Sequence, residues 1–76
     1  MNLFKTGIQG TYNKLFINLD NVVAILPNNR NGNAIIDCIG DDENRSYFTN
    51  ENFEKVVERI LRGDLLGEDK WLTIQE

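Results

Sequence analysis

The clearest pattern of apolar and polar positions lies in the second half of the chain. Phe53, Val56, Val57, Ile60 and Leu61 recur at i, i+3, i+4, i+7 and i+8, and the residues between them are polar. This spacing places the five apolar side chains on one stripe of an α-helix. We therefore predict an amphipathic helix over about residues 50–62 that buries this stripe against the rest of the domain.

Both ends of this helix carry the signals of a helix terminus. Thr49 is the predicted N-cap, because it places Phe48 and Phe53 at the spacing of a hydrophobic staple. Asn50 is the alternative cap. At the other end, Gly63 can adopt the left-handed backbone conformation that stops a helix.

The remainder of the chain alternates short runs of high β-propensity with turn residues. Asn31-Gly32 suits a tight turn with positive φ between two of these runs, and the polar group Asn18, Asp20 and Asn21 indicates a bend or a single helical turn. We predict strands over residues 3–8, 15–17, 22–26, 34–39, 45–48 and 70–74. The run at 34–39 is expected to pair with 22–26 in one hairpin and with 45–48 in a second. The expected fold is α+β, with a mainly antiparallel sheet of four to six short strands and the helix packed on one face.

The run Val22-Val23-Ala24-Ile25-Leu26 is apolar on both of its alternating faces. A sheet with a helix on one side and water on the other should instead alternate apolar with polar residues. We therefore expect something to cover the second face, either the tail around residues 71–74 or a second copy of the protein. The predicted interface residues are Val22, Ala24, Leu26, Tyr47, Trp71 and Leu72.

Length and charge narrow the classes of function. A chain of 76 residues has room for one domain, so we expect a single domain over residues 1–76 with a thin core. The net charge of −4 disfavours binding to nucleic acid or to anionic membranes. No secretion signal or membrane-spanning run is present, so we expect a cytoplasmic protein.

Little in the sequence suggests catalysis or a cofactor. The chain has no histidine, and its one cysteine, Cys38, lies in an apolar strand where a thiol is usually buried with a raised pKa. Asp37 beside it is expected on the outer face of the sheet. The remaining acidic residues lie in turns without the spacing of a calcium loop, and the notable ones are Asp41, Asp42, Glu43, Asp64, Glu68 and Asp69.

The order of features over residues 16–62 resembles small bacterial flagellar proteins of the FlbD or SwrD type. The first matching stretch is F-x-L/I-N-x-D-x-I-x-x-I, followed by a hairpin, a short strand and E-x-x-x-x-V-x-x-x-I. The matching residues here are Phe16, Ile17, Asn18, Asp20, Val22, Val23, Ile25, residues 34–40, Tyr47, Glu51, Val56, Val57, Glu58 and Ile60. The loop at residues 27–33 and the extension at residues 65–76 depart from this pattern.

These observations lead to one expected function and one alternative. We expect a non-enzymatic interaction module of bacterial or phage type, without a cofactor, that binds a protein partner or itself as a homo-oligomer through the sheet. The alternative is a small metal-dependent or ligand-binding protein that uses the acidic turns.

Overall fold

The first hairpin of the chain forms a two-stranded antiparallel sheet. In the computed structural model, which describes residues 2–40 and 43–65, β1 (Leu3–Gly7) pairs with β2 (Lys14–Asn18). Gly10 lies in the connecting turn with φ of 77°, a value that glycine adopts without steric cost. The strands predicted for this part of the chain are confirmed.

A second, three-stranded antiparallel sheet has the order β3-β4-β5. A 3-10 turn, η1 (Leu19–Asn21), leads into β3 (Val22–Pro27), as the polar group in the sequence predicted. The strands β4 (Asn33–Ile39) and β5 (Asn44–Asn52) complete the sheet, so both predicted hairpins are confirmed.

The loop between β3 and β4 is wider than a two-residue turn. Gly32 has φ of 76° as the sequence predicted, but no residue other than glycine has positive φ in the described part of the chain, so Asn31 does not share this conformation. The amide of Gly32 donates to the carbonyl of Asn28, and the amide of Asn28 donates to the carbonyl of Asn33. These bonds close a compact loop and fix the register of the hairpin.

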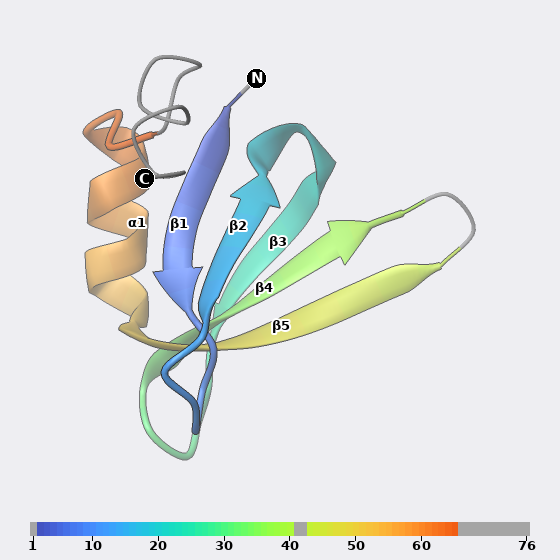
Figure 1. Ribbon diagram of the computed structural model, residues 1–76. Helices are drawn as coiled ribbons and strands as arrows, with labels where there is room; N and C mark the ends of the chain where they lie inside the picture. Colours follow the sequence, from blue (N-terminus) through green and yellow to red (C-terminus); the bar gives the residue numbers. More distant parts are fainter. Residues whose placement is uncertain (1, 41–42, 66–76) are drawn as a thin grey trace.

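The two sheets meet at one end and diverge toward the other. A single bridge pairs Ile8 with Thr49, and the amide of Gln9 donates to the carbonyl of Phe48 at 2.9 Å. Figure 1 shows α1 (Phe53–Leu61) beside β1, with the β4–β5 hairpin extending away from the helix on the other side. This helix also contacts β3, β4 and β5. The predicted α+β class is therefore confirmed.

The helix begins later than the sequence indicated. Thr49 and Asn50 lie in β5, and the N-cap is Asn52, whose side-chain oxygen accepts hydrogen bonds from the amides of Glu54 and Lys55. The predicted Thr49 cap and its staple are wrong, because the Thr49 hydroxyl is fully buried and donates to the carbonyl of Ala34 at 2.8 Å. This cross-strand bond holds residue 49 in the sheet.

The core lies between the two sheets and the helix. Its central apolar cluster draws on every element except η1, β3 and β5, and the buried members are Phe4, Ile17, Ala34, Ile36, Cys38 and Val56. Val56 is the one fully buried residue of the helical stripe. Leu61 at the end of the stripe is 83% exposed, which corrects the expectation that the whole stripe is buried. Gly63 ends the helix with φ of 79°, as predicted.

An ionic network fastens the helix to both sheets. The guanidinium of Arg59 pairs with the carboxylate of Glu51 in β5, and it donates to the carbonyl of Lys5 in β1 at 3.0 Å. It also lies 4.5 Å from the centre of the Phe4 ring. Burial alone would lower the pKa of Arg59, but hydrogen bonds to Glu51 and Asp64 outweigh burial and raise it. Arg59 therefore remains a cation at every ordinary pH.

Candidate functional site

The face of the three-stranded sheet that points away from the core is an apolar surface. Direct cross-strand pairing places Leu26, Ile35 and Phe48 in one row across the sheet. Ile36, the neighbour of Ile35, is fully buried in the core, so the alternation of strand side chains directs this row to the opposite side. We call this side of β3, β4 and β5 the outer face.

Large apolar side chains of the outer face remain accessible to solvent. Leu26 is 47% exposed, Phe48 is 49% exposed, and Ile39 at the end of β4 is 52% exposed. Within residues 2–40 and 43–65, the helix and the core cluster lie on the other side of this sheet. Large exposed apolar side chains gathered on one face of a sheet are typical of an interaction site.

The structure separates the residues that the sequence grouped as an interface. Ala24 and Leu26 lie on the outer face, whereas Val22 and Tyr47 pack against the core cluster. Trp71 and Leu72 lie outside the described residues, as does the predicted strand at residues 70–74.

A β-bulge explains why Val22 and Ala24 face opposite sides. Val22 pairs with Cys38, and Ala24 pairs with Asp37, the next residue back along β4. The extra residue, Val23, shifts the alternation by one position. No glycine or proline marks this bulge in the sequence, so simple alternation assigned Val22 and Ala24 to one face.

Three outer-face residues were not included in the predicted interface: Ile35, Ile39 and Phe48. The feature that identifies them is the pairing of β4 with β5, because it places Ile35 opposite Phe48. Phe48 was instead assigned to a helix staple, so it was not counted among the interface residues.

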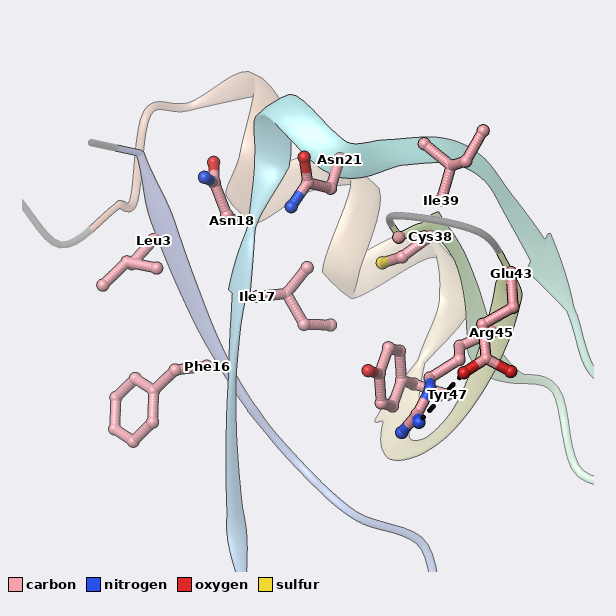
Figure 2. A pocket seen from close by; sticks show the side chains of 11 residues that line it. Leu3, Phe16, Ile17, Asn18, Asn21, Cys38, Ile39, Glu43, Arg45 and Tyr47 are labelled. Carbon is pink, nitrogen blue, oxygen red and sulfur yellow. Dashed lines mark ion pairs between the residues drawn. The ribbon is translucent and has the colours of Figure 1, made fainter.

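A groove with a volume of about 760 Å³ opens where the two sheets diverge. Figure 2 shows Ile17 of β2, Cys38 of β4 and Tyr47 of β5 around this space. At its rim Arg45 pairs with Glu43 at 3.6 Å, and both side chains are largely exposed. The groove therefore contains apolar walls and an ion pair, and Tyr47 belongs to it rather than to the outer face.

The thiol in this groove is poorly suited to nucleophilic chemistry. Burial, and secondarily the negative charge of Asp37, raises the pKa of Cys38 above the ordinary value of a thiol. The reactive form of cysteine is the thiolate, whose population falls as the pKa rises. The carboxylate of Glu43, which also lines the groove, forms an ion pair with Arg45.

We expect iodoacetamide at pH 8 to alkylate Cys38 at least about tenfold more slowly in the folded protein than in urea. The raised pKa also sets a pH dependence, because above about pH 8.5 the unfolded thiol releases its proton while the folded thiol retains it. The free energy of unfolding should therefore fall as the pH rises through this range. Cys38→Ser should remove that component of the pH dependence. Equal alkylation rates in both states would contradict the burial of this thiol.

The acidic turns are only partly within the described residues. Glu43 pairs with Arg45, and Asp64 accepts a hydrogen bond from Arg59 at 2.9 Å. Within residues 2–40 and 43–65, no group of three or more acidic or cysteine side chains is arranged to hold a metal ion. The other acidic turn residues, Asp41, Asp42, Glu68 and Asp69, lie outside the described residues.

Comparison with protein-family models, with curated proteins and with solved structures finds no match to this chain. The resemblance to the flagellar proteins stays a prediction. In the part of the chain that the structure describes, no helix is long and apolar enough to cross a membrane.

Proposed function

We propose that this chain is a non-enzymatic protein-interaction module, of the bacterial or phage type, that binds its partner through the outer face of β3, β4 and β5. The observation that carries this proposal is the row of Leu26, Ile35 and Phe48, whose two ends are about half exposed, on a sheet whose other face forms the core. The buried centre of a protein interface is its most apolar part, and aromatic side chains such as Phe48 are enriched there.

The backbone around this row supports a preformed site. The pairing of β3 with β4 is unbroken from Ala24 to Pro27, and the register of β4 with β5 shifts between Asn33 and Ile35, at the edge of the row. The bond from Gln9 fastens the Phe48 end of the row to the first sheet. A partner would therefore meet side chains whose positions are already fixed by the sheet, which lowers the entropy cost of binding. The groove and Cys38 offer no comparable arrangement for catalysis.

A pair of substitutions on the outer face tests this function. We expect Leu26→Ser combined with Phe48→Ser to remain folded, because both side chains are about half exposed in the wild type. The measurement is the apparent size of the tagged full-length chain in an extract of its native host, by size-exclusion chromatography with immunodetection. The wild type should elute in a complex, and the double variant should elute at the size of the purified protein.

Tyr12→Ser is the matched control, because Tyr12 is fully exposed in the turn between β1 and β2. This variant should elute with the wild type. Elution of the double variant in the same complex as the wild type would rule out the outer face as the interface.

A further inference from the structure

The outer face carries one carboxylate next to its apolar row. Ala24, Asp37 and Ser46 pair directly across the sheet and form a second row beside Leu26, Ile35 and Phe48. The hydroxyl of Ser46 donates to Oδ1 of Asp37 at 2.7 Å. Among the described residues of these strands, Asp37 is the one ionisable side chain on the outer face, since Arg45 pairs with Cys38 and lies on the inner side.

A partner that covers the apolar row must also cover Asp37. A buried carboxylate without a counter-charge is costly, whereas a carboxylate paired with a cation and hydrogen-bonded is tolerated. The Ser46 hydroxyl satisfies part of the hydrogen-bonding capacity of Asp37, and a carboxylate can accept several further bonds. Within residues 2–40 and 43–65, no lysine or arginine forms an ion pair with Asp37. The described part of the chain therefore supplies no cation to Asp37, and a partner can supply one.

The same charge argues against a second copy packed face to face. The described outer face of a second copy would bring another Asp37 and no cation, and each chain has a net charge of −4. Like charges at the centre of an interface oppose association. Electrostatic complementarity therefore favours a different protein with basic character.

We infer that the outer face binds a segment of another protein that presents apolar side chains to the Leu26, Ile35 and Phe48 row and one lysine or arginine to Asp37. This inference rests on the proposed function. Asp37 and Ile35 are two residues apart on β4, roughly 7 Å along the strand. An extended segment with an apolar residue at i and a basic residue at i+2 has the same spacing. Arginine suits the site especially, because its guanidinium can donate two parallel bonds to a carboxylate.

A library of short random peptides displayed on phage provides the test. It is selected in parallel on the purified full-length wild type, Asp37→Asn, Asp37→Lys and Phe48→Ser. The wild type should enrich peptides with apolar and basic residues at alternating positions. Asp37→Asn should retain the apolar preference and lose the basic one, and Asp37→Lys should enrich acidic peptides. For one selected peptide, we expect Asp37→Asn to weaken the Kd by roughly tenfold, with the binding of the wild type decreasing as salt is raised.

The outcomes separate this inference from the function on which it rests. If peptides bind the wild type and Phe48→Ser equally, the outer face is not the binding surface and the proposed function fails. If Phe48→Ser abolishes selection but Asp37→Lys retains the basic preference, the outer face binds while the inference about Asp37 is overturned.

Two other occupants would also overturn the inference. A second copy would appear in sedimentation equilibrium as a dimer of the purified chain that Phe48→Ser dissociates. The chain's own tail contains Lys70 and Trp71. If this tail covered the face, Trp71→Ser would increase peptide capture several-fold, whereas the inference predicts no change.

Discussion

Val56→Asp should leave the chain unfolded at room temperature, as measured by circular dichroism and urea denaturation. The Val56 side chain is fully buried on the inner side of α1, in one cluster with Phe4 and Ile36. A carboxylate there loses the apolar contacts and is transferred from water into the core, which we expect to cost at least about 4 kcal/mol. A domain of this length has roughly 5–10 kcal/mol of stability in total, so the loss is comparable with the whole.

Leu61→Asp is the matched control on the same helix. Leu61 belongs to the same stripe in the sequence but is 83% exposed, so the same substitution should cost under about 1 kcal/mol. Unfolding of both variants would contradict the burial pattern of α1, as would a folded Val56→Asp protein with a wild-type urea midpoint.

The second large effect is expected at Arg59. Arg59→Met retains the aliphatic stem and removes the guanidinium, so the carboxylate of Glu51 keeps the bond from the Thr6 hydroxyl but loses its cation, and the carbonyl of Lys5 loses the bond from Arg59. The side chains of Arg59 and Glu51 are only 18% and 19% exposed, so solvent can replace the lost bonds only in part. Removing one partner of such a pair should lower the free energy of unfolding by about 2–4 kcal/mol.

Arg62→Met isolates the contribution of burial. Arg62 also pairs with a glutamate on the helix, Glu58, but those side chains are 62% and 71% exposed. An exposed pair of this kind contributes under about 0.5 kcal/mol, so the urea midpoint should barely move. If the two arginine variants lost equal stability, the Arg59 network would not fasten the helix to the sheets.

Much of the fold follows from local patterns in the sequence. The helical stripe, the turn at η1 and both β-hairpins were predicted because each depends on residues close together in the chain. The start of α1 was not predicted, since the hydroxyl of Thr49 bonds to Ala34, fifteen residues earlier. This hydrogen bond holds Thr49 in β5, so the strand continues beyond the residue that the local sequence predicted as the helix N-cap. Glu51 also lies in β5 rather than in the first turn of the helix, and its carboxylate accepts hydrogen bonds from Arg59 and Thr6.

The candidate site was less predictable than the fold. An apolar second face was evident from the β3 run, but the residues on it depend on the bulge at Val23 and on the register between β4 and β5. The position of Asp37 beside Ser46 also requires that register, because these residues are nine apart in the sequence and bond across the sheet. Register depends on the packing of the whole sheet, which short-range patterns do not encode.

Photo-crosslinking in the native host tests the central claim most directly. The full-length chain is expressed with p-benzoylphenylalanine in place of Phe48 on the outer face, or in place of Tyr12 in the exposed turn between β1 and β2. Both positions hold exposed aromatic side chains, so the comparison isolates the surface on which each lies. We predict one discrete adduct with another protein from position 48 and none from position 12. Adducts of the same mass from both positions, or none from position 48, would contradict the claim that the outer face is a protein interface.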